Sequence, residues 1–121
     1  MPRIQGDLLE RSFSFAVRIL HLVDLLPSGT RGWLVAKQLS RCGTSIGANL
    51  SEADFSFTTI DFSHKCNLSL KEAAETLYWL RLTKAGRLLD GVELEALIAE
   101  ADELKRILNT IVKKTQRSTE N

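Results

Sequence analysis

Few residues in this sequence have the type and spacing that catalysis or metal binding requires. A di-iron centre in a helical bundle needs Glu-x-x-His on two helices, so that a carboxylate and an imidazole point inward together. Neither His21 nor His64 follows a glutamate at that spacing, and the spacing of Glu72 and Glu75 is common on solvated helix faces. His64 and Cys66 lack further ligands at zinc spacing. We therefore expect no metal, no cofactor and no enzyme activity, with a metal-dependent bundle enzyme as the third alternative.

The two cysteines, Cys42 and Cys66, lack the CxxC spacing of redox or metal-binding pairs. We expect both to be reduced thiols that pack in the core. Cys42 could act as a nucleophile only with a base beside it, and no such arrangement stands out. A glycine loop for phosphate is also absent from the sequence, because Gly43 and Gly47 lie inside a helical pattern.

Phosphate contact is a second chemistry that the sequence could support. Nucleic-acid binding uses cations for the phosphates and aromatic rings for the bases. Basic residues gather near Trp33 and near Trp79, in two segments that we expect to meet at one end of the fold. The candidate contacts are Arg31, Lys37, Arg41, Arg81, Lys84 and Arg87. The acidic start of the segment that follows is expected at the same end, and neutralisation of this cluster is the alternative.

Two rows of polar residues border predicted core positions. One row shares a helix face through steps of four and three residues and consists of Ser45, Asn49 and Glu52. A comparable row on the next segment consists of His64, Lys71, Glu75 and Tyr78. Polar groups beside a core need hydrogen-bond partners, so we expect an interhelical network that fixes the register of the two segments. A small pocket is the alternative.

The elements that position these residues are predicted to be helices. The chain has 121 residues, 44% of them hydrophobic, and only two prolines, which favours one all-α domain over a strand-rich or disordered chain. A formal net charge of +1 argues against a histone-like binder. That charge is nevertheless segregated: residues 90–103 carry six acids and no base, and residues 105–117 carry five bases and no acid. Helix dipoles favour this arrangement.

Apolar periodicity predicts four helices, at about 7–26, 31–54, 59–87 and 92–114, with Thr30 as N-cap of the second and residues 115–121 as a frayed tail. Short loops make neighbouring helices antiparallel, so the fold class is an up-and-down four-helix bundle. On the first helix, a wide apolar stripe includes a second row that contains Phe13 and Leu20.

The second predicted helix carries a row of small residues: Ala36, Ser40, Gly43, Gly47 and Ser51. Two glycines inside a helix cost about 1 kcal/mol each relative to alanine, so another backbone is expected to approach closely along this face. A helix broken at Gly43 is the alternative, although the apolar period continues past it.

The cellular location is predicted from the lack of a targeting or membrane-spanning pattern in the sequence. The first residues lack the apolar core of a signal peptide before Asp7 and Glu10. The most apolar run, residues 19–26, is interrupted by His21 and Asp24 and is too short for a membrane span. We therefore expect a cytoplasmic protein that does not associate with membranes.

Two stretches carry a resemblance to a known family. Residues 38–53, QLSRCGTSIGANLSEA, resemble the second-helix signature of the four-helix-bundle proteins first noted in 23S rRNA intervening sequences. Residues 61–65 (DFSHK), 70–73 (LKEA) and 75–81 (ETLYWLR) are similar to the third-helix signature of that family. The two motifs occur in the family's order, and the resemblance covers most of the chain.

This resemblance implies a bacterial, cytoplasmic protein that assembles into a homopentamer and has no known catalytic activity. Distant relatives, the accessory proteins of diversity-generating retroelements, work with a reverse transcriptase and nucleic acid through a basic surface. The predicted function is a non-enzymatic, homopentameric scaffold or adaptor that associates with RNA or a nucleic-acid-handling protein. The alternative is a purely protein-binding scaffold without a nucleic-acid ligand.

Overall fold

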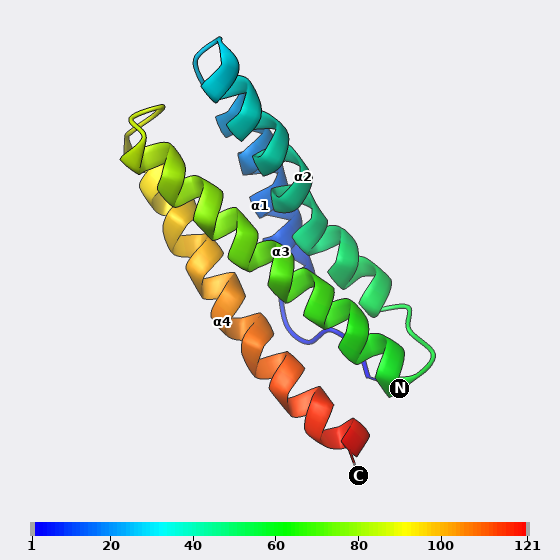
Figure 1. Ribbon diagram of the computed structural model, residues 1–121. Coiled ribbons are helices and arrows are strands. Elements are labelled where there is room, and N and C mark those ends of the chain that lie inside the picture. The colour runs from blue at the N-terminus through cyan, green and yellow to red at the C-terminus, as the bar shows by residue number, and fades with distance from the viewer. Residues whose placement is uncertain (1, 121) are drawn as a thin grey trace.

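The computed structural model describes residues 2–120 and shows an all-helical, antiparallel up-and-down bundle (Figure 1), which confirms the predicted fold class. The four helices are α1 (Leu8–Val23), α2 (Thr30–Ala53), α3 (Thr59–Ala85) and α4 (Val92–Glu120). Helix α3 packs against both α2 and α4, whereas α1 packs mainly against α2 and only lightly against α4.

Each helix contributes one buried stripe to a single core. In α1 the stripe advances by steps of four and three, which keeps it on one face of the helix. The largest fully buried side chains are aliphatic or aromatic apart from one threonine: Phe15, Ile19, Leu22, Leu39, Ile46, Leu50, Leu80, Leu94, Leu97, Leu104, Leu108 and Thr76. Thr76 satisfies its hydroxyl by donating to the Glu72 carbonyl oxygen one turn earlier, at 2.7 Å.

Helix α2 is continuous through Gly43, and α1 lies against its glycine face. A Cβ atom on Gly43 would lie 2.9 Å from Cγ2 of Ile19. A Cβ atom on Gly47 would lie 3.3 Å from the backbone carbonyl of Ser12. The predicted close approach is therefore confirmed, and the alternative of a broken helix is wrong. The missing side chains allow the α1 backbone to approach α2 closely.

Several helix ends differ from the sequence-based expectation. Helix α3, predicted to reach residue 87, ends at Ala85 with Gly86 as its C-cap. Helix α1 ends at Val23, because Pro27 disfavours helical geometry just before it, and the chain turns through hydrogen bonds from Leu25 and Leu26. The N-cap of α2 is Gly29, with φ of 112°, rather than Thr30. Helix α4 continues to Glu120, so the expectation of a frayed tail is wrong for residues 115–120; residue 121 lies outside the described residues.

The segment before α1 is not helical and is tied to the end of α2. A guanidinium nitrogen of Arg3 donates to the carbonyl oxygen of Asp54 at 2.5 Å. The backbone N–H of Ile4 donates to the Asp54 side chain at 2.9 Å. Residues 2–7 therefore continue the line of α1 as a strap that is held on the α2 side of the bundle.

Replacement of Gly32 by alanine is expected to destabilise the bundle more than a typical surface substitution. A Cβ atom at this position would lie only 1.8 Å from the backbone carbonyl oxygen of Pro27, so the turn between α1 and α2 has to move. We expect Gly32→Ala to lower the free energy of unfolding by at least about 2 kcal/mol in urea denaturation. The exposed neighbour Thr30→Ala is the control, with a change within about 0.5 kcal/mol. Equal effects of the two variants would contradict this packing.

Candidate interaction surface

Helices α2 and α3 run antiparallel in a register that polar contacts fix. Ser69 of α3, which is fully buried, donates its hydroxyl to the carbonyl oxygen of Ile46 in α2 at 2.8 Å. Lys65 pairs with Glu52 at 3.1 Å near one end of this helix pair. Arg41 pairs with Glu72 at 3.3 Å, and also with Glu75, nearer the other end. The start of α2 therefore lies beside the end of α3.

Two of the six predicted nucleic-acid contacts are occupied by carboxylates. Arg41 is held by Glu72 and Glu75 of α3, and its hydrogen bond to Glu75 is the main cause that raises the pKa of the guanidinium. Lys84 pairs with Glu95 at the start of α4, at 2.7 Å. The acidic start of α4 therefore neutralises part of the cluster, as the alternative interpretation anticipated.

The other four cations make no ion pair with any side chain that the structure describes. We call Arg31, Lys37, Arg81 and Arg87 the basic end. The Lys37 ammonium lies 5.1 Å from the centroid of the Trp33 ring, a cation–π contact, and 63% of Trp33 is exposed. Trp79 differs, because it is half-buried, donates its indole N–H to Glu75 at 3.2 Å and meets Tyr78 edge-on. Of the two tryptophans, Trp33 is therefore the exposed one.

The predicted polar rows do not form one continuous interhelical network. Ser45 and Asn49 donate to carbonyl oxygens of their own helix, those of Arg41 and Ser45. Glu52 and Glu75 do reach across the helix pair, to Lys65 and Arg41 respectively. The remaining members of the rows, His64, Lys71 and Tyr78, are exposed and make no hydrogen bond to a described side chain or backbone. The cross-helix contacts instead use Arg41, Lys65 and Ser69, which were outside the predicted rows.

Several large apolar side chains are exposed, among them Phe55, Phe57 and Ile60 around the α2–α3 loop, at 79%, 87% and 72%. Two further groups lie on the helices themselves. The α1 patch consists of Phe13, Val17 and Leu20, which are 70%, 39% and 47% exposed. The α2–α3 patch consists of Leu34, Tyr78 and Leu82, which are 42%, 58% and 39% exposed. The antiparallel register of the two helices puts Leu34 level with Leu82. The second row of the apolar stripe predicted on the first helix is thus exposed at Phe13 and Leu20, because the stripe is wider than the face that the core covers.

The candidate groups for catalysis show no assembled site in the part of the chain that is described. Residues 2–120 contain no cluster of three or more His, Cys, Asp or Glu side chains that could hold a metal. Cys42 and Cys66 are buried free thiols, and burial raises the pKa of Cys66 to about 11. Desolvation likewise raises the pKa of Cys42. Among the described helices, none combines the length and hydropathy of a membrane span.

Comparisons with known proteins agree with this architecture. The family model of the 23S rRNA-intervening sequence protein matches residues 5–110. A crystal structure from Bacteroides thetaiotaomicron, described as a protein of unknown function from the S23 ribosomal protein family, is 37% identical in sequence. The similarity covers 88% of this chain and 98% of that one, with a TM-score of 0.80. No protein with a curated description matches.

Removal of the Glu75 carboxylate is expected to weaken the bundle in a pH-dependent way. Hydrogen bonds from Arg41 and from the Trp79 indole lower the pKa of Glu75 in the folded protein. A lowered pKa stabilises the fold above the unfolded-state value, about 4.3, and that contribution is lost as the pH falls through the folded-state value. We expect Glu75→Gln to cost about 0.5–1 kcal/mol at pH 7, with the difference from wild type shrinking towards pH 3.

The control for this measurement is Glu95→Gln, which removes the partner of Lys84 where both side chains are about half exposed. We expect a smaller loss of stability in urea denaturation, because water screens an exposed pair. A wild-type advantage over Glu75→Gln that stays constant from pH 7 to pH 3 would contradict the assigned role of the carboxylate.

Proposed function

Because this chain belongs to the 23S rRNA-intervening sequence protein family, we propose that it is a non-enzymatic, cytoplasmic scaffold that self-assembles and associates with RNA or a ribonucleoprotein. The observation that carries the proposal is the pairing of two separate exposed apolar patches with a basic end that includes the exposed Trp33. The first feature supports assembly, and the second supports a nucleic-acid ligand.

Self-assembly into a ring needs two different surfaces that meet between neighbours. The α1 patch and the α2–α3 patch meet this requirement, since they lie on different helices and each presents three neighbouring apolar side chains. Exposed apolar clusters mark interaction sites on soluble proteins. In this assembly, the α1 patch of one copy contacts the α2–α3 patch of the next copy. The same contact is repeated from copy to copy until the ring closes. The family resemblance implies that this ring has five subunits.

An RNA ligand is supported by the chemistry of the basic end and by the family's name, which refers to 23S rRNA. Arg31, Arg81 and Arg87 are exposed guanidinium groups, which suit phosphate oxygens. Trp33 offers a ring on which an unpaired base can stack, with the Lys37 charge next to it. Assembly of several copies would multiply these contacts along one RNA.

A purely protein-binding scaffold is the second candidate, and the same apolar patches favour it. Salt distinguishes the two candidates. Nucleic-acid affinity falls steeply as salt rises, because phosphate contacts release counterions, whereas docking of apolar side chains does not. A metal-dependent bundle enzyme is the third candidate, and metal analysis of the purified protein tests it.

The assembly is expected to depend on the α1 patch. Light scattering coupled to gel filtration of the wild-type protein at micromolar concentration should give the mass of a pentamer. Phe13→Glu places a charge at the most exposed member of the patch and should shift the protein towards monomer, with unchanged helical circular dichroism. Ser14→Glu, exposed on the same helix but outside the patch, should leave the mass unchanged. A wild-type monomer under these conditions contradicts the proposed assembly.

Binding of a structured RNA with an unpaired loop should require the basic end. Fluorescence anisotropy at low salt should give an affinity that falls steeply as salt is added. The double variant Arg81→Glu and Arg87→Glu should weaken binding at least about tenfold. The matched double variant Lys105→Glu and Lys113→Glu makes the same charge change on α4. If both double variants weaken binding equally, or if the wild type does not bind, the assigned RNA site is wrong.

A further inference from the structure

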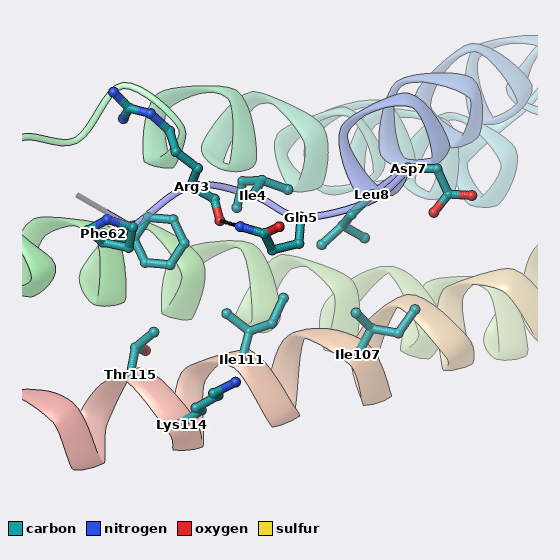
Figure 2. A pocket seen from close by; sticks show the side chains of 11 residues that line it. Arg3, Ile4, Gln5, Asp7, Leu8, Phe62, Ile107, Ile111, Lys114 and Thr115 are labelled. Carbon is teal, nitrogen blue, oxygen red and sulfur yellow. Dashed lines mark hydrogen bonds between the residues drawn. The ribbon is translucent and has the colours of Figure 1, made fainter.

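A cavity of about 450 Å³ lies beside the N-terminal strap, at the end of the bundle opposite the basic end. Its walls come from the strap, the start of α3 and the C-terminal part of α4 (Figure 2). It is independent of the surfaces used in the proposed function.

The cavity follows from the unequal lengths of the first and last helices. Arg18 pairs with Glu93 and Arg11 with Glu100, so α1 covers the first part of α4 in antiparallel order. Helix α1 begins at Leu8, whereas α4 continues to Glu120. Beyond Glu103, the strap takes the place of α1. An extended chain fills less space than a helix, and the bonds of Arg3 and Ile4 to Asp54 hold the strap on the far side, against α2.

The cavity is lined mainly by apolar side chains, with polar groups at its ends and Gln5 between them, whose amide donates to the Arg3 carbonyl oxygen at 3.4 Å (Figure 2). The apolar lining consists of Pro2, Ile4, Leu8, Phe62, Ile107 and Ile111. Thr115 closes one end, where its hydroxyl donates to Ser63 of α3 at 3.1 Å. Lys114 lies at this same end (Figure 2), and Asp7 lies at the other, beside the start of α1. A pocket with apolar walls and a few placed polar groups is typical of a small-molecule site.

The charges favour an anion at the Lys114 end. Lys114 is exposed and makes no ion pair with any described side chain. It belongs to the acid-free segment 105–117, which carries five bases. Arg3, the other basic lining residue, is turned towards the end of α2 by its bonds to the Asp54 and Ser56 carbonyl oxygens. Asp7 disfavours an anion at the opposite end, so a bound molecule would have a defined direction.

We propose that this cavity binds a medium-chain aliphatic carboxylate, with its acyl chain along Ile107 and Ile111 and its carboxylate on the Lys114 ammonium. The α4 backbone from Ile107 to Lys114 spans about 10 Å, the length of a medium-chain acyl group. Phe62 of α3 and Ile4 of the strap cover the chain on its other sides. The site goes beyond the scaffold function and does not depend on it.

Methyl NMR of the full chain with labelled isoleucine tests the proposal, with sodium octanoate as the probe. Saturable shifts are expected at the methyl groups of Ile4, Ile107 and Ile111, with little change at Ile60 and Ile98, which do not line the cavity. Octanol should bind at least about tenfold more weakly than octanoate, since it lacks the charge-assisted contact. Octylammonium should bind more weakly still.

Lys114→Glu should raise the dissociation constant for octanoate at least about tenfold. Position 114 is exposed, and the same spectra report whether the variant is folded. The matched control is Lys113→Glu, an adjacent exposed lysine that does not line the cavity, with a change within about twofold. The proposal is overturned if millimolar octanoate leaves the three methyl groups unshifted. It is also overturned if octanol binds as well as octanoate, or if the two lysine variants behave alike.

Discussion

The contact of α1 with the glycine face of α2 determines much of the surface of this protein. Ile19 and Ser12 lie against Gly43 and Gly47, at distances that leave no room for a Cβ atom without movement of the neighbour. With those two side chains turned inward, the helical period turns Phe13, Val17 and Leu20 outward. The α1 patch is therefore a geometric consequence of how α1 is seated on α2.

Because α1 is short, it leaves the C-terminal part of α4 uncovered. Its first turn lies near Glu100 and Glu103, which pair with Arg11, and α4 extends well beyond that level. The uncovered part of α4 keeps Ile107 and Ile111 half-buried beside the strap. Helices of unequal length in one bundle thus create a cavity at one end, while the other end carries the four cations of the basic end, which make no ion pair with a described side chain.

Local patterns in the sequence predicted the helices and the glycine contact, because both depend on spacing within one segment. The patterns did not predict which polar groups bond across helices. Ser45 and Asn49 have the spacing that an interhelical network needs, yet their side chains donate to carbonyl oxygens of their own helix. Such local hydrogen bonds to the backbone compete with bonds to another helix. The cavity was also missed, because it depends on where Arg3 meets Asp54, a contact between segments far apart in the sequence.

The central claim is that the α1 patch of one copy contacts the α2–α3 patch of the next. A photo-crosslinking amino acid in place of Phe13, followed by mass spectrometry of the linked peptides, tests this contact directly. The account predicts links from position 13 to peptides of a second copy that contain Leu34, Tyr78 or Leu82. Links only between the α1 helices of two copies, or no link between copies, would contradict it.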